Sequence, residues 1–164
     1  SLLFISLFIL AACGGGGGST TTSPAGCSPS TTNLCITVVG GKYVVQNSSS
    51  AGVSQKTLTL NAGTYTFDQT DSSNVTPAGA YGSARIHQIG FSTTSDGTFG
   101  GGSTYSTGVN TSGSPGSNGK TTIVIDASTP STLYYYCVNH TGMGGTINIV
   151  IGNQSEQVEF TETN

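Results

Sequence analysis

From residue 36 onward the chain is a succession of short runs rich in β-branched and aromatic residues, separated by Gly, Asn and Ser. Apolar and polar residues alternate in several runs, as in Leu58-Thr59-Leu60, and alternation with a period of two is typical of half-buried strands. No window has the periodicity and capping residues of a helix. We expect strands over these ranges: 36–39, 43–46, 56–60, 64–68, 84–91, 121–125, 132–138 and 146–151.

Short strands at this spacing predict an all-β fold, a Greek-key sandwich or barrel of about eight strands. Asn61-Ala62-Gly63 reads as a tight turn between two of them. Two polar stretches interrupt the pattern, residues 71–82 and the Gly-, Ser- and Thr-rich residues 92–119. The second stretch is longer than an ordinary connection, so we expect either a structured excursion or a disordered segment.

Residues 1–12 form an apolar run that ends in small residues. The run is too short to span a bilayer as a helix and is typical of the h-region of a signal peptide. The alternative is a buried strand with an incidental cysteine. Leu10-Ala11-Ala12-Cys13 resembles the lipobox of bacterial lipoproteins, which implies cleavage before Cys13 and acylation of that cysteine. An initiator methionine and a basic n-region are missing, so we expect further residues before Ser1.

The segments on either side of the strand-rich region differ from it in composition. Residues 13–26 contain five consecutive glycines followed by Ser and Thr, a composition that forms a flexible linker. We expect the folded domain over 27–151 and a solvated acidic tail with three glutamates over 152–164. These features predict an extracytoplasmic protein that a lipid anchors to a membrane, in the periplasm or at the cell surface.

Of the four cysteines, Cys13 is assigned to the lipid and Cys137 lies far from the others. Cys27 and Cys35 remain as a close pair, and in an exported chain such a pair most simply forms a disulfide. A metal site is the alternative for this pair, although no histidine lies nearby to complete it.

An aromatic run at 133–136 leads into Cys137, His140 and Met143, which follow one another at three-residue intervals. A thiolate, imidazole and thioether are the donors of a copper electron-transfer site, which also needs a second imidazole. The chain has only two histidines and one methionine, so the second imidazole has to come from His87.

Each of these residues also has a purely structural interpretation. Cys137 can be a buried thiol of the core, and Met143 can be a packing residue. His87 lies between Ile86 and Ile89, where a histidine is more often a hydrogen-bonded core residue than a metal ligand.

Taken together, the strands and the Cys-x2-His-x2-Met spacing resemble a cupredoxin, the blue-copper family that includes plastocyanins and amicyanins. The resemblance covers roughly residues 36–151, and the short ligand spacing is closest to that of amicyanins. It implies one mononuclear copper held by a histidine from a mid-chain strand end and by three ligands from a loop between the last two strands. These ligands would be His87, Cys137, His140 and Met143. Gln88 departs from the family, which often has Asn at this position to tie the ligand segments together.

The resemblance implies one-electron transfer by an exported type 1 copper protein, with a transient redox partner protein. We expect a monomer whose more exposed ligand, His140, serves as the electron port. Two alternatives use the same chain differently. The four ligands would also serve copper capture or delivery at the cell envelope, and a metal-free module would use residues 92–119 for surface display.

The charge pattern argues against other classes of function. Only 7% of the residues are charged and the net charge is −3, so no basic patch can hold a nucleic-acid backbone. The sequence offers neither paired carboxylates nor a Ser-His-Asp arrangement, and both histidines are assigned to copper. We therefore expect a protein that is not an enzyme.

Overall fold

The computed structural model describes residues 23–78 and 82–152. The predicted h-region, the predicted acylation site Cys13, most of the predicted linker and nearly all of the predicted acidic tail lie outside these residues. Within the described ranges no helix has the length and apolar character needed to cross a membrane.

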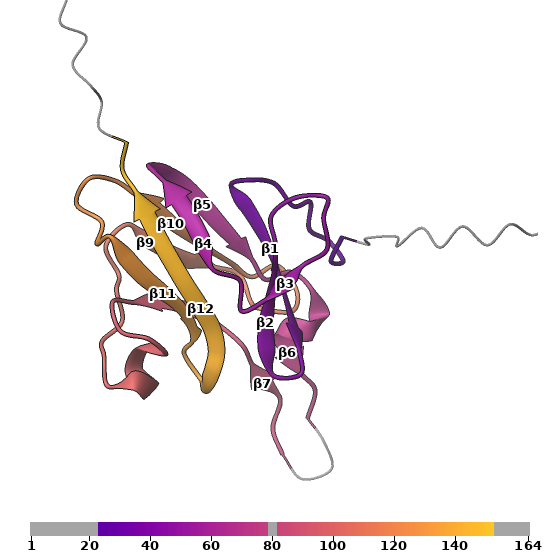
Figure 1. The fold of residues 1–164 in the computed structure, drawn as a ribbon. Helices are drawn as coiled ribbons and strands as arrows, with labels where there is room; N and C mark the ends of the chain where they lie inside the picture. Colours follow the sequence, from indigo (N-terminus) through magenta and orange to yellow (C-terminus); the bar gives the residue numbers. More distant parts are fainter. Residues whose placement is uncertain (1–22, 79–81, 153–164) are drawn as a thin grey trace, which may run out of the picture.

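The fold is all-β and consists of two mixed sheets with a shared apolar core (Figure 1). The six-stranded sheet, in the order β3-β2-β1-β5-β10-β9, comprises β1 (Asn33–Val39), β2 (Lys42–Gln46), β3 (Val53–Ser54), β5 (Gly63–Asp68), β9 (Val109–Ser112) and β10 (Lys120–Ile125). The four-stranded sheet, in the order β4-β12-β11-β8, comprises β4 (Leu58–Asn61), β8 (Ile89–Ser92), β11 (Thr132–Cys137) and β12 (His140–Val150). A two-stranded sheet and two short 3-10 helices complete the fold: β6 (Val75–Thr76), β7 (Arg85–Ile86), η1 (Ser72–Asn74) and η2 (Gly97–Gly100).

The all-β prediction is confirmed, and every predicted strand range contains a strand. Two details differ from the expectation, and the structure decides between the two alternatives for residues 92–119. Range 84–91 is two strands, because the chain leaves β7 at Ile86 and enters β8 only at Ile89. The last strand begins at His140, well before residue 146, and residues 92–119 are structured, with η2 and β9 among them.

The expected turn at Asn61-Ala62-Gly63 is a corner between the two sheets. Strand β4 pairs with β12 in the four-stranded sheet, whereas β5 pairs with β1 and β10 in the six-stranded sheet. Gly63 has φ +149°, a conformation that L side chains rarely adopt, so the sharp change of direction uses a glycine. Sequence alternation identified both strands, but it contains no information on which sheet each strand joins.

Aromatic side chains from both sheets meet in the core. Phe67 packs edge-on against Phe91 with ring centroids 5.0 Å apart, and Tyr135 lies 6.0 Å from Phe67 and 6.4 Å from Tyr43. All four rings are at most 1% exposed. Each such side chain contributes roughly 1.5–3 kcal/mol by its burial. Both buried tyrosines keep a hydrogen bond, from Tyr135 to the Lys56 carbonyl and from Tyr43 to the His87 carbonyl.

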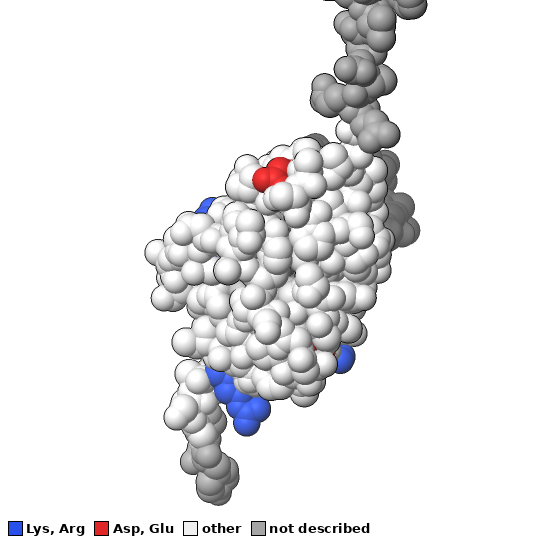
Figure 2. All heavy atoms as spheres, turned by 90° about the vertical axis from the view of Figure 1, so that its left-hand side faces the viewer, with Lys and Arg blue, Asp and Glu red and all other residues white. Residues whose placement is uncertain are grey.

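Charged side chains are sparse on the surface, and on the face shown in Figure 2 nearly all atoms belong to uncharged residues. Among the described residues one ion pair forms, between Lys120 and Asp68 at 3.0 Å. Strand pairing and apolar packing therefore carry most of the stability.

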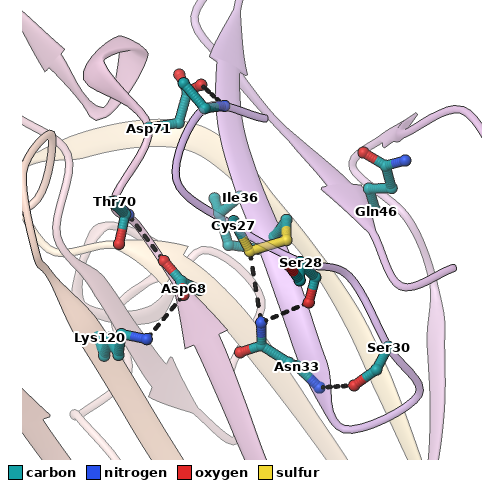
Figure 3. The surroundings of a disulfide bond; sticks show 12 residues. Cys27, Ser28, Ser30, Asn33, Ile36, Gln46, Asp68, Thr70, Asp71 and Lys120 are labelled. Carbon is teal, nitrogen blue, oxygen red and sulfur yellow. Dashed lines mark hydrogen bonds and ion pairs between the residues drawn. A yellow bond between two sulfur atoms is a disulfide. The ribbon is translucent and has the colours of Figure 1, made fainter. Parts of the chain in front are cut away.

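A disulfide joins Cys27 to Cys35, and so ties the segment before β1 to the strand itself (Figure 3). The side chain of Asn33 supports this loop by donating to the Ser28 carbonyl at 2.9 Å. Asp68, at the end of β5, is 2% exposed and accepts hydrogen bonds from the Thr70 amide and from Lys120.

Burial raises the pKa of Asp68, but the hydrogen bonds from Thr70 and Lys120 and the charge of Lys120 outweigh it and lower the pKa below 3.8. The ionised carboxylate therefore stabilises the fold above about pH 4, and this stability is lost as the pH falls through the lowered pKa. We expect Asp68→Asn to cost about 1–3 kcal/mol at neutral pH. It should also flatten the acid branch of the curve of unfolding free energy against pH. Thermal melts followed by circular dichroism at several pH values measure this curve.

Lys120→Met removes the ion pair and leaves the Thr70 hydrogen bond, so its acid branch should lie between those of the wild type and Asp68→Asn. An unchanged acid branch in Asp68→Asn would show that the carboxylate does not contribute in this way.

Candidate metal centre

His87, Cys137 and His140 come together where β11 ends and β12 begins. The start of β12 is at the lower end of the molecule in Figure 1. His87 lies in the break between β7 and β8, Cys137 is the last residue of β11, and His140 is the first residue of β12. In the β-ladder Cys137 pairs with Ile89 on one side and with His140 on the other. The pairing of β11 with both neighbours therefore places the three side chains at one point.

The donor atoms of His87, Cys137 and His140 all lie within 4.8 Å of one another. The Cys137 Sγ is 3.4 Å from Nδ1 of His140, and the two imidazole rings have centroids 4.7 Å apart. Cys137 is fully buried, His87 is buried, and His140 is half-buried. Donors this close are able to share one metal ion, whose bonds to nitrogen and sulfur measure about 2.0–2.3 Å.

His87 has one ring nitrogen in a hydrogen bond and one without a partner. Its Nε2 lies 3.0 Å from the Thr76 hydroxyl. Its Nδ1 is buried, and among the described residues it is the one buried side-chain nitrogen or oxygen that has no hydrogen-bond partner. A buried polar atom without a partner costs about 1–3 kcal/mol. A metal ion would satisfy this nitrogen, so the residues present fit a metal centre.

Burial lowers the pKa of His87, and the neighbouring charges of His140 and Arg85 lower it further. A lowered pKa keeps the ring neutral near pH 7. The neutral ring is the form that ligates a metal, because a lone pair is then available on nitrogen.

A buried polar network holds the backbone of His87. Its N–H donates to the Asn74 carbonyl at 3.0 Å, and its carbonyl accepts from the Tyr43 hydroxyl at 2.8 Å and from the Gln69 side chain. Burial and the adjacent Cys137 raise the pKa of Tyr43 well above its ordinary value, so the phenol remains a donor. Gln69 and Asn74, both fully buried, are also bonded to each other at 3.0 Å.

Sequence reasoning missed Tyr43, Gln69 and Asn74. Tyr43 reads as an ordinary strand residue, and the two amides lie in polar stretches that resemble loops. The only available signal was their chemistry, because a buried amide needs partners, but the sequence does not show which amides are buried.

Hydrogen bonds join the segment that contains His87 to the turn after Cys137, but the Gln88 side chain does not make them. The side-chain Nε2 of Gln88 donates to the Thr121 hydroxyl at 2.8 Å. Its backbone carbonyl, in contrast, accepts from the Val138 N–H at 3.0 Å, and Asn139 Nδ2 donates to the Ile86 carbonyl at 2.8 Å. Two hydrogen bonds thus join the β7–β8 break to the turn that separates Cys137 from His140.

Met143 lies on an irregular part of β12. Tyr135 pairs with Gly145 and Cys137 with His140, so the single residue Tyr136 faces residues 141–144. We call residues 141–144 the Met143 bulge. Met143 is 2% exposed, belongs to the core, and lines the same pocket as His87 and His140. The expected ligands after Cys137 are therefore part of a bulged strand, where the resemblance implies a loop.

No protein-family model matches the chain, and no curated protein matches its sequence. The buried group of His87, Cys137 and His140 can bind a metal ion.

Gly144 is required by the close approach of the Met143 bulge to β11. A Cβ on Gly144 would lie 1.7 Å from the Tyr135 carbonyl oxygen, so Gly144→Ala has to push the two strands apart. We expect it to cost at least about 1–3 kcal/mol, as overpacking does. Thermal melts of the metal-free protein measure this loss.

Gly152→Ala is the matched control, because a Cβ there meets nothing within 4 Å. A Gly144→Ala protein as stable as this control would contradict the described path of the bulge.

Proposed function

We propose that this chain is a cupredoxin-like type 1 copper protein that carries single electrons outside the cytoplasm. One observation carries the proposal: both histidines of the chain converge on its buried free thiol from separate segments. The site residues would be His87, Cys137, His140 and the buried Met143. The fold supports the proposal, since the last two strands, β11 and β12, carry three of these residues, and we propose Greek-key connectivity for the two sheets.

The donor set favours copper over other metals. Two imidazoles with one thiolate and a thioether is the ligand set of blue-copper electron-transfer sites, whereas hard cations such as magnesium and calcium take oxygen ligands. Bound copper would supply the Cu(I)/Cu(II) couple. Among the residues of the site, Cys137 and His87 exclude water by their burial, and the network around His87 keeps that ring in place.

The surroundings of the site are suited to a short-lived protein contact. His140 is half-buried. Two apolar side chains close to the ligands in the chain are exposed: Val138, two residues before His140, by 37%, and Ile86, directly before His87, by 46%. We propose that the redox partner docks around His140 and that these exposed apolar side chains contribute to the contact, since transient redox complexes bury little area. His140 is then the port through which the electron leaves.

The proposed location outside the cytoplasm is supported by two separate features. The lipobox-like residues 10–13 follow an apolar run, and the Cys27–Cys35 disulfide is of the kind that persists in oxidising compartments. We propose a lipoprotein held at a membrane through Cys13 and acting as a monomer.

Adding Cu(II) to the purified protein should produce an intense visible absorption band from thiolate-to-copper charge transfer. Cys137→Ser should abolish the band and leave the circular dichroism spectrum unchanged, because the site needs a thiolate. Met143→Gln should keep the band and shift it, because the axial donor tunes the site. A folded wild-type protein that shows no such band with Cu(II) would end the proposal.

Copper capture or delivery is the second candidate, and the half-buried His140 on an open pocket is the observation that favours it. Competition with a strong Cu(I) chelator separates the two functions. Electron transfer predicts slow loss of copper from the wild type, and delivery predicts rapid loss.

A further inference from the structure

Three side chains from separate segments hold the Met143 bulge. Lys42 Nζ donates to the Gly142 carbonyl at 2.5 Å, and Gln55 Nε2 donates to the carbonyls of Gly142 and Gly144 at 3.2 and 2.7 Å. The Asp96 carboxylate accepts from the Gly142 N–H at 2.8 Å and from the Thr141 hydroxyl. The positively charged Lys42 side chain thus binds the carbonyl of Gly142, and the negatively charged Asp96 side chain binds its N–H. Hydrogen bonds that involve a charged group are stronger than those between neutral groups.

These bonds replace the ladder pairing that the bulge interrupts. Residues of a bulge lose their regular partners on the neighbouring strand, so their N–H and C=O groups need partners from elsewhere. Here the partners are side chains, and they act on both peptide groups that flank Gly142, the residue before Met143.

Gln55 and Asp96 share an unusual backbone conformation. They are the described non-glycine residues with positive φ, at +47° and +58°. For residues other than glycine this region is disfavoured, and such strain persists where the surrounding structure imposes it, often at functional sites. Both residues with this strain contact the same bulge.

The excursion over residues 92–108 brings Asp96 to the bulge. Asp96 precedes η2, but its side chain makes no cap of that helix and is directed to Gly142 instead. The excursion is fixed against β11 by the bond between Thr104 and the Tyr136 hydroxyl, at 2.8 Å. Gly97 packs so closely on Tyr136 that a Cβ would lie 2.4 Å from the ring. The small residues of this stretch therefore permit a tight approach to the metal-binding end of β11.

We propose that Lys42, Gln55 and Asp96 are positioning residues that fix the Met143 bulge before metal binds, and that residues 92–108 serve to present Asp96. The metal-dependent part of this inference rests on the proposed copper site. Fixing the bulge holds Met143, and His140 at the start of the same strand, in one arrangement with or without metal.

The metal-free protein provides the first test. Hydrogen exchange of the Gly142 amide, followed by NMR, should be at least about 10-fold faster in Asp96→Ala than in the wild type, because opening then breaks no bond to the carboxylate. Asp96→Asn keeps an acceptor oxygen and should restore most of the protection. Asp126→Ala is the matched control, because it removes a carboxylate that accepts within its own turn, from Ser128 and Thr129. Equal Gly142 exchange in Asp96→Ala and the wild type would overturn the proposal.

The second test uses copper-loaded protein. Removal of Cu(I) by a strong chelator should be about 10- to 100-fold faster in Asp96→Ala and in Gln55→Ala, the range for loss of groups that support metal ligands. The charge-transfer band should also shift in both variants, and Asp126→Ala should behave as the wild type does. Gln55→Ala keeps the test decisive if Asp96→Ala fails to fold.

The two tests separate the possible failures. A wild type that binds no copper contradicts the proposed function, and the exchange experiment still decides whether the bulge is held. Copper that leaves the wild type and both variants at one rate, with one spectrum, overturns the positioning role and leaves the copper site standing.

Discussion

The pairing of β11 with two neighbouring strands is the constraint on which the site depends. Cys137 ends β11, and its antiparallel partners bring the start of β8 to one side and His140 to the other. The burial pattern of the strand fixes this register, because a slip by one residue would turn every side chain to the opposite face. Tyr135, two residues before Cys137, is buried against Phe67 and Tyr43, so the core holds the same register from within.

The site combines a dry interior with a polar network that is almost completely satisfied. Tyr43, Gln69 and Asn74 all use their polar atoms around the backbone of His87, and buried networks of this kind specify a single arrangement when every member is bonded. The unpaired Nδ1 of His87 is the exception. A buried nitrogen without a partner costs free energy, and a metal ion bound there would remove that cost.

Rigidity bears on the choice between the two functions proposed for the candidate copper site. A site that carries electrons benefits from ligands that stay in place, whereas a site that releases its metal needs a ligand segment able to open. The bonds from Lys42, Gln55 and Asp96 to the Met143 bulge oppose such opening. For this reason the structure of the bulge fits electron transfer better than delivery.

The sequence alone predicted the all-β class, because alternation with a period of two reflects burial on one face of a strand. It also indicated the donor set, since Cys137, His140 and Met143 are close in the chain and His87 is the remaining imidazole. The three-dimensional fold was needed to show that 84–91 breaks at His87, that β4 and β5 belong to different sheets, and that Asp96 reaches Gly142. These features depend on contacts between segments far apart in the chain, and local patterns of hydrophobicity do not predict such contacts.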